Sequence, residues 1–433
     1  MHRIASLPTE EPSENLALIE QPHAPILFLT TAASDVSTLA YVLQEKKAIR
    51  QRYEIRAIHL KSLKHNAQID HYISTTGSKA KIIIVRFLGS RSAWSYGFEQ
   101  LVDWSTKDKI TRKLIILSGT EEDEVELNGM SDINFEISRK LGKLLRVGGF
   151  ENMQIFLNII SNYIENKTVN INDFSVKKIE DPYLWDWKKG NGKKVGIIFY
   201  SSMLNSGDTE YAQNLLTLLR EEGINPRAIW VSSLKKDYVQ KRILTLFKHE
   251  NLNCIITATS FASVNFEDSS DGSQIWDKLN VPIFQILTSN KQKKEWEQSS
   301  RGIDAIDLSM QVVMPELDGR ITTKIAAFKE KIEDDLSLYS PIYKLKADNK
   351  NLKWIVSFTK AWISLQKAQK KEVKATLILS NYPIRDGRLA NGVGLDTPAS
   401  ILSILKFLKN EGYDLGAESL PNNPKELMRL ILS

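Results

Sequence analysis

Short apolar runs alternate with longer amphipathic stretches along this chain of 433 residues, and that alternation most constrains its fold. The runs are rich in Ile, Val and Phe and have the length of buried strands. The first four are PILFLTT (25–31), YEIRAIHL (53–60), KIIIVRFL (81–88) and KLIILSG (113–119). Stretches between them, such as DVSTLAYVLQEKKAI (35–49), carry apolar residues at helical spacing. The pattern predicts a parallel sheet covered by helices.

A second series of the same kind follows a polar stretch that ends in WDWKKGNGKK. Its predicted strands are KVGIIFY (194–200), PRAIWVS (226–232), NCIITAT (253–259) and VPIFQIL (281–287), with helices near 209–222 and 236–250. The predicted fold class is α/β, with tandem doubly wound parallel-sheet domains and the start of a third α/β domain.

The third unit is predicted to contain a helix at 351–370, the strand ATLILS (375–380) and the loop NYPIRDGRLANGVGLDTPAS (381–400). Thr397 and Pro398 suit the cap and first position of a following helix. The predicted limits are 1–170 for the first domain, 171–193 for a linker, 194–335 for the second domain and 336–433 for a truncated third.

Composition excludes several classes of protein. The net charge of +6 comes from 58 basic and 52 acidic residues without a basic arm, so nucleic acid is not an expected partner. The single cysteine, Cys254, lies in an apolar run and is expected to be a buried structural thiol. No run of 18 apolar residues predicts a membrane span, and the amino terminus lacks the apolar character of a signal peptide. A cytoplasmic location is expected.

Common catalytic motifs are missing from the sequence. It has neither a GxxxxGK[ST] loop nor a GxGxxG after the first strand of either domain, so ATP hydrolysis by a P-loop route is not expected. The six histidines form no HExxH motif, and GxSxG does not occur. We therefore assign no metal ligand and no catalytic residue.

Four clusters of glycine and charge are predicted to follow strands, where open α/β sheets bind ligands. They are RFLGSRSAWSYG (86–97), SSMLNSGDTEY (201–211), MPELDGR (314–320) and the loop at 381–400. Each has a simpler interpretation as a turn with solvated charges. Trp94 suits either a flat anionic ring or the core, and Ser206 or Asp208 can cap the next helix while Gly207 takes a left-handed turn.

These clusters also carry a family resemblance. RFLGSRSAWSYGFEQL, SSRGIDAIDLSMQVVMPELDGRITTK and NYPIRDGRLANGVGLDTPASILSIL resemble the large subunits of aerobic cobaltochelatase (CobN) and, more distantly, the porphyrin-binding H subunits of magnesium chelatase. The DGRLxNGVGLDTP motif favours a resemblance to the cobalt enzyme over the magnesium enzyme. The resemblance implies insertion of Co²⁺, as substrate, into hydrogenobyrinic acid a,c-diamide during cobalamin biosynthesis. It also implies AAA+ partner subunits that hydrolyse ATP in place of this chain.

Candidate contacts to the corrin carboxylates and amides come from the last two clusters. They are Arg385, Asp386, Arg388 and Asn391, with Glu316, Asp318 and Arg320 as a second polar group. Family chains are longer, and their His-Gly-x-x-Glu-Trp-Leu-Pro-Gly segment does not occur in this sequence. We expect an amino-terminal part of the subunit that is not a competent chelatase alone and that works with a carboxyl-terminal remainder.

Three alternatives stay open at this point. The first is a magnesium chelatase H-type subunit that acts on protoporphyrin. The second is a non-catalytic module that binds a tetrapyrrole or a partner protein. The third is an unrelated two-domain α/β transferase with a ligand in its cleft.

Overall fold

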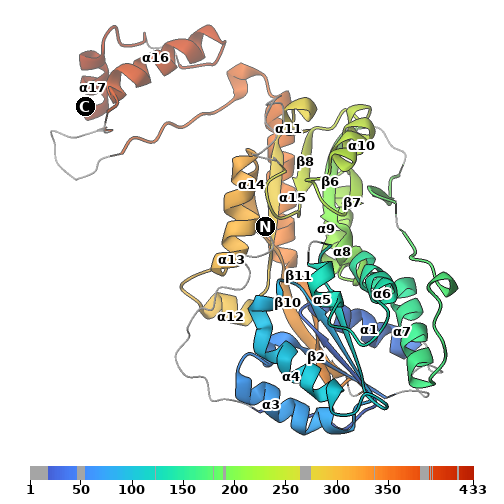
Figure 1. The fold of residues 1–433 in the computed structure, drawn as a ribbon. Helices are drawn as coiled ribbons and strands as arrows, with labels where there is room; N and C mark the ends of the chain where they lie inside the picture. The colour runs from blue at the N-terminus through green and yellow to red at the C-terminus, as the bar shows by residue number, and fades with distance from the viewer. Residues whose placement is uncertain are drawn as a thin grey trace. The chain divides into compact units, whose positions relative to one another are not determined.

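A computed structural model describes residues 18–45, 54–121, 123–178, 180–188, 192–263, 275–335, 337–380, 390, 392, 394–416 and 419–433. The chain divides into two compact units, Met1–Val356 and Ser357–Ser433. Two sheets form the frame of the first unit (Figure 1). In the described residues, no helix is both long and apolar enough to cross a bilayer.

The first sheet is entirely parallel, with strand order β2-β1-β3-β4. Its strands are β1 (Ile26–Thr30), β2 (Ile55–His59), β3 (Ile82–Phe87) and β4 (Lys113–Ser118). Alternate side chains of β1 enter opposite cores: Ile26 and Phe28 on one face, Leu27 and Leu29 on the other. Burial on both faces explains why the run ILFLT is apolar throughout.

Helices cover both faces of this sheet, as the sequence predicts. The helices are α1 (Ala33–Glu45), α3 (Asn66–Ser74), α4 (Ser95–Thr106), α5 (Glu124–Asn128), α6 (Phe135–Val147) and α7 (Phe150–Ile164), with short η2 (Leu60–Ser62), η3 (Thr76–Lys79), η4 (Arg91–Trp94) and η5 (Ile171–Asp173). α1, α6 and α7 pack on one face, and α3 and α4 pack on the other.

The second sheet is mixed, with strand order β11-β10-β9-β8-β6-β7-β5. Its strands are β5 (Tyr183–Trp185), β6 (Lys193–Tyr200), β7 (Ile224–Val231), β8 (Cys254–Thr257), β9 (Ile283–Ser289), β10 (Ile321–Asp335) and β11 (Ser340–Ala347). The five central strands are parallel, but β5 and β11 add antiparallel edges. The predicted α/β class is confirmed, with a mixed second sheet in place of a wholly parallel one. Cys254 is buried in β8, as predicted.

The remaining elements of the first unit connect these strands. They are α8 (Ser201–Asn205), α9 (Glu210–Glu221), α10 (Asp237–Lys248), α11 (Ile275–Leu279), α12 (Lys293–Gln298), α13 (Ala305–Leu308), the π-helical η6 (Ser309–Val313) and α14 (Met314–Leu317), with α15 (Asn349–Lys367) following β11. The apolar VV before MPELDGR is therefore helical, so that cluster follows a helix and not a strand as predicted.

The hairpin of β10 and β11 joins the two sheets. Its tip packs against the edge strand β2, where the Ala57 amide donates to the Leu338 carbonyl at 3.1 Å. Gln21 Nε2 donates to the Tyr339 carbonyl at 2.7 Å, and Leu338 and Ile342 enter the core of the first sheet. The segment 340–347, predicted to open a third domain, thus belongs to the second sheet and packs on the first.

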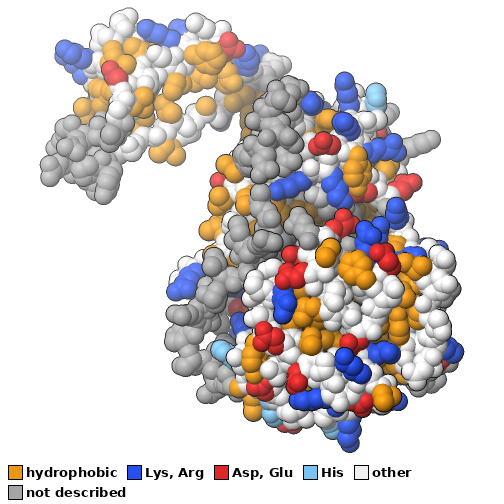
Figure 2. Space-filling view, viewed as in Figure 1, with side chains coloured by type: hydrophobic (Ala, Val, Ile, Leu, Met, Phe, Trp, Pro, Cys, Tyr) orange, Lys and Arg blue, Asp and Glu red, His pale blue; other side chains and the backbone are white. Residues whose placement is uncertain are grey.

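The second unit has few elements and a small core. It contains the end of α15, η7 (Lys370–Glu372), α16 (Thr397–Asn410) and α17 (Pro424–Leu432). Residues 375–380, predicted as the strand ATLILS, have no strand assignment in the described part of the chain. Figure 2 shows hydrophobic side chains gathered over the part of the chain that holds α16 and α17.

The start of α16 also differs from its prediction. Asp396 is the residue that caps the helix, and its carboxylate accepts from the Ala399 amide at 3.1 Å. Thr397 is the first helical residue and Pro398 the second. The cap thus lies one residue earlier in the chain than predicted.

Candidate functional site at the carboxyl ends of the strands

A buried ion pair lies where β1 and β3 end. Thr30 and Arg86 are paired residues on these neighbouring strands, and Asp35 follows in the first turn of α1. Arg86 Nη1 donates to Asp35 Oδ1, and Thr30 Oγ1 donates to Asp35 Oδ2 at 2.7 Å. Burial raises the pKa of Asp35, while Arg86 and Thr30 oppose the rise. The first arginine of the predicted cluster therefore already has a carboxylate partner.

The rest of RFLGSRSAWSYG has mainly a packing role. Trp94 Nε1 donates to the Leu63 carbonyl at 3.1 Å, and its ring lies within 5.2 Å of the Phe98 ring centre. A Cβ on Gly97 would lie 2.2 Å from the Trp94 ring, so glycine is needed for this close approach. Of the two interpretations left open for Trp94, the geometry favours the core. Arg91 is exposed.

A second polar group includes the end of β2 and a lysine of β10. His59 ends β2, Lys61 follows it, and Lys329 projects from β10. Burial, followed by the charges of Lys61 and Lys329, lowers the pKa of His59 to about 4. Burial and Lys61 also lower the pKa of Lys329, while Asp208 and Asp307 oppose this. The arrangement places cationic groups at the carboxyl end of the first sheet, a suitable environment for an anion.

Asp208 links SGDT to β11 and does not cap α9. Its Oδ1 accepts from the Leu345 amide at 3.1 Å, and its Oδ2 accepts from Ser206 Oγ at 3.2 Å. Burial raises the pKa of Asp208. Gly207 takes the predicted left-handed conformation with φ of 74°. The carboxylate therefore holds the turn before α9 to β11.

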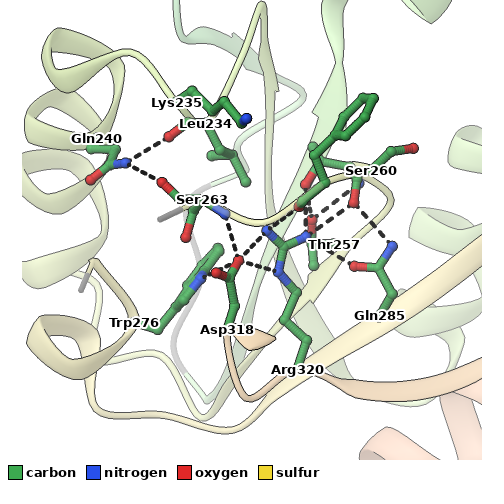
Figure 3. A network of polar contacts seen from close by, with 12 residues as sticks. Leu234, Lys235, Gln240, Thr257, Ser260, Ser263, Trp276, Gln285, Asp318 and Arg320 are labelled. Atoms are coloured by element: carbon green, nitrogen blue, oxygen red, sulfur yellow. Dashed lines mark hydrogen bonds and ion pairs between the residues drawn. The ribbon is translucent and has the colours of Figure 1, made fainter. Parts of the chain in front are cut away.

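MPELDGR contributes a buried pair, which Figure 3 shows in its network. Arg320 Nη2 donates to Asp318 Oδ2 at 2.6 Å, and both side chains are 0% exposed. Asp318 Oδ2 also accepts from the Ser263 amide at 2.8 Å and from Trp276 Nε1 at 3.1 Å. Burial lowers the pKa of Arg320, and Asp318 opposes this effect.

The guanidinium group of Arg320, the residue before β10, bonds to β9 and to the segment that follows β8. It donates to the Thr259 carbonyl at 3.0 Å, to Gln285 Oε1 at 3.1 Å and to the Phe261 carbonyl at 3.1 Å. These bonds fix the segment after β8 to β9 and β10. Asp318 and Arg320, predicted to contact substrate, are paired with each other in the interior, and their role as contacts remains a prediction. Glu316 is exposed and stays a candidate contact.

The remaining predicted contacts belong to the loop at 381–400. Arg385, Asp386, Arg388 and Asn391 lie outside the described residues. Their role remains a prediction.

A basic cleft of about 380 Å³ lies beyond β4. Its charged lining residues are Arg139, Lys140, Lys143, Arg146 and Lys178 with Glu121 and Glu136. Arg146 Nη1 donates to the carbonyl of Ser118, the last residue of β4, at 3.1 Å. No group of three His, Cys, Asp or Glu side chains in the described ranges could hold a metal ion.

Sequence reasoning missed the group around Lys329. Its lysine lies in a strand with many charges, which lacks the apolar pattern of the predicted strands. His59 lies at the end of a predicted strand and Asp35 a few residues after another, so their positions were a usable signal. Nothing in the sequence indicates that β10 passes close to His59.

The fold is an α/β fold with polar groups at the carboxyl ends of its strands, and comparison with known proteins identifies its family. The chain belongs to the CobN/Magnesium Chelatase family, whose family model matches residues 143–433.

Its relatives include both branches of that family. Aerobic cobaltochelatase subunit CobN of Pseudomonas aeruginosa is 28% identical over 440 residues, which cover 97% of this chain and 34% of the relative. Its counterpart from Sinorhizobium sp is 26% identical, with coverages of 95% and 33%. Magnesium-chelatase subunit ChlH of Oryza sativa subsp. indica is 24% identical over 261 residues, covering 59% of this chain and 17% of the relative. The chain spans about a third of the length of the two cobaltochelatase relatives.

A solved structure agrees with the fold. The catalytic subunit of cobaltochelatase from Mycobacterium tuberculosis superposes with a TM-score of 0.59 at 20% identity, over 95% of this chain and 33% of that one.

Proposed function

We propose that this chain is the amino-terminal part of the tetrapyrrole-binding large subunit of an ATP-dependent cobaltochelatase. The complete enzyme would insert Co²⁺, its substrate, into hydrogenobyrinic acid a,c-diamide in cobalamin biosynthesis. AAA+ partner subunits would hydrolyse the ATP, and a carboxyl-terminal polypeptide would supply the remaining chemistry.

The observation that carries this proposal is the extent of the match to the cobalt branch. The Pseudomonas relative aligns with 97% of the chain, whereas the rice magnesium relative aligns with 59%. The cobalt relative therefore accounts for more of this chain than the magnesium relative does. A magnesium chelatase H-type subunit acting on protoporphyrin is the second candidate, because it belongs to the same family.

The geometry supports a binding role for the strand ends. A corrin substrate has a flat apolar face and several carboxylates or amides, which cationic and amide side chains bind well. We assign direct contacts to Arg385, Asp386, Arg388, Asn391 and Glu316. Asp318 and Arg320 hold the segment after β8 in place from the interior.

Spectral titration tests substrate choice. Absorbance of hydrogenobyrinic acid a,c-diamide and of protoporphyrin is followed as the 433-residue chain is added. We expect a saturable change with the corrin, weakened about tenfold or more by Arg388→Ala, because a charge-assisted hydrogen bond is worth about 1.5–3 kcal/mol. Arg91→Ala, at an exposed arginine of η4, is the matched control.

Each outcome decides between the candidates. Tighter binding of protoporphyrin would favour the magnesium branch. Unchanged curves with a folded Arg388→Ala variant would remove that residue from the site. Cobalt insertion by this chain with only its ATPase partners would contradict the need for a further polypeptide, and tetrapyrrole binding without insertion in any combination would favour a non-catalytic module.

A further inference from the structure

The basic cleft beyond β4 contains none of the residues that we assign to the tetrapyrrole. Its ten lining residues include five basic and two acidic side chains, so they carry a net charge of +3. The whole chain has a net charge of +6. A cavity lined mainly by one sign of charge concentrates its field and attracts ligands of the opposite sign. The basic cleft is therefore a candidate site for an anion.

One wall of the basic cleft is a face of α6. Arg139, Lys143 and Arg146 follow one another four and three residues apart, so their side chains leave the helix on the same side. Because an α-helix rises 1.5 Å per residue, they span about 10 Å along its axis. The bond from Arg146 to the Ser118 carbonyl places one end of this row at the carboxyl end of β4, where open α/β sheets bind ligands.

A second wall is the segment 171–178, which side chains of two helices hold in place. Lys140 Nζ of α6 donates to the Ile171 carbonyl at 2.6 Å. Asn152 of α7 is 2% exposed and bonds to the Lys177 backbone in both directions. Its Oδ1 accepts from the amide at 2.8 Å, and its Nδ2 donates to the carbonyl at 2.9 Å. The wall is thus fixed without a ligand, which lowers the cost of binding one.

Two lysines of the lining have donors to offer. Lys143 lies on α6 and Lys178 on the second wall, and both are exposed. Neither ammonium group forms a hydrogen bond or an ion pair with the part of the chain that the structure describes. An ammonium group has three donors and no acceptor. A ligand in the cleft can therefore accept from both walls at once.

Size and lining favour a small ligand over a protein segment. The volume of about 380 Å³ lies in the lower part of the range for cavities that hold small molecules. Ile171 and Val176 are its only apolar lining residues, whereas protein partners need larger apolar anchors. A row of charges about 10 Å long suits a chain of phosphate groups better than a single one.

We propose that the basic cleft binds a linear polyphosphate of two or three phosphate groups, either free or as part of a nucleotide. Lys143 and Lys178 donate to its oxygens from the two walls, and the arginines of α6 add positive charge along its length. The proposal concerns binding alone and does not rest on the proposed function.

Calorimetric titration of the 433-residue chain with tripolyphosphate, at about 0.15 M salt, tests the proposal. We expect saturable binding that is about tenfold or more tighter than that of orthophosphate, because a longer anion reaches both walls. Lys143→Gln and Lys178→Gln should each weaken binding about fivefold or more. Lys143→Arg keeps the charge and should retain most of the affinity. Lys241→Gln, at an exposed lysine of α10, is the matched control.

ATP without magnesium distinguishes the two sources of the ligand. An affinity equal to or below that of tripolyphosphate would identify a free polyphosphate, and markedly tighter binding would identify a nucleotide. Hydrogen exchange supplies a second measurement. Tripolyphosphate should slow amide exchange in residues 171–178 and leave α10 unchanged.

Three results would overturn the proposal. The first is the lack of saturable binding at about 0.15 M salt, where loose attraction of counterions is screened. The second is unchanged binding by the double variant Lys143→Gln/Lys178→Gln, shown by circular dichroism to be folded. The third is tighter binding of poly-L-glutamate than of tripolyphosphate, which would identify an acidic protein segment as the occupant.

Discussion

At the scale of the residue, the surroundings of His59 disfavour protonation of its imidazole ring. The ring is largely buried, and its Nδ1 accepts from the Lys61 amide at 3.1 Å. Protonation of Nδ1 would break that bond and place a cation near Lys61 and Lys329. Burial of the ring, followed by the charges of Lys61 and Lys329, lowers the pKa of His59 to about 4 from an ordinary value of 6.5.

Stability should therefore depend on pH through His59. Above about pH 6.5 the imidazole is neutral in the folded and unfolded states. Between 6.5 and about 4 the unfolded state binds the additional proton, so the free energy of unfolding should fall as the pH falls, by at most about 3 kcal/mol. His59→Gln should reduce this slope in urea unfolding measured across the range. His249→Gln, at an exposed position, is the control; an unchanged slope in His59→Gln would contradict the assignment.

At the scale of the element, the pair of Asp318 and Arg320 holds β10 to the segment after β8. A buried guanidinium without its carboxylate is costly, whereas replacing both partners with apolar groups is often tolerated. This difference separates a structural pair from a pair that contacts a ligand.

Asp318→Asn should lower the free energy of unfolding by about 3–5 kcal/mol, because Arg320 would then lose its buried counter-charge. The double variant Asp318→Leu/Arg320→Met should be less destabilised than the single one in urea unfolding. Asp334→Asn, in the exposed pair with Lys331, should cost no more than about 1 kcal/mol. Full stability of Asp318→Asn with loss of corrin binding would instead support a ligand contact.

The elements differ in how well local sequence predicts them. β1, β3 and β4 are buried on both faces, so continuous apolar runs identify them within one residue or so at either end. β10 was missed because half of it, KEKIEDD, is a charged ribbon that pairs with β11. ATLILS was predicted as a strand from the same apolar signal, but a strand also needs a partner, which no local pattern supplies.

In the candidate site, too, local sequence predicts some features, and others depend on residues that are distant in the chain. Arg86, Gly207 and Asp208 were singled out because their clusters were predicted to lie at the ends of strands. The left-handed turn at Gly207 was predicted correctly. Whether a charged group is exposed or already paired depends on distant residues. The partners of Arg86 and Arg320 came from the structure alone, and so did the approach of Lys329 to His59.

At the scale of the whole molecule, the first unit is one body because the β10–β11 hairpin contributes to the core of the first sheet. Leu338 is fully buried there, together with residues of β1 and α1. The two predicted α/β domains therefore share apolar packing and are not linked by a connection alone.

Leu338→Ala should consequently destabilise the first sheet although it lies in a hairpin of the second. A loss of about 2–5 kcal/mol is expected for a buried leucine. Hydrogen exchange of the β1 and β2 amides should accelerate. Leu317→Ala, at a position 57% exposed, is the control and should change little. Unchanged exchange in β1 and β2 would show that the hairpin is not part of their core.

The hairpin also sets an order of events during synthesis on the ribosome. Gln21 bonds to Leu338, 317 residues later in the chain, so the edge of the first sheet cannot be completed when its own strands emerge. At about 5–20 residues per second the delay is roughly 15–60 s. During that interval the β2 edge is open to pairing with other nascent chains, and a chaperone that shields this edge should raise the yield of folded protein.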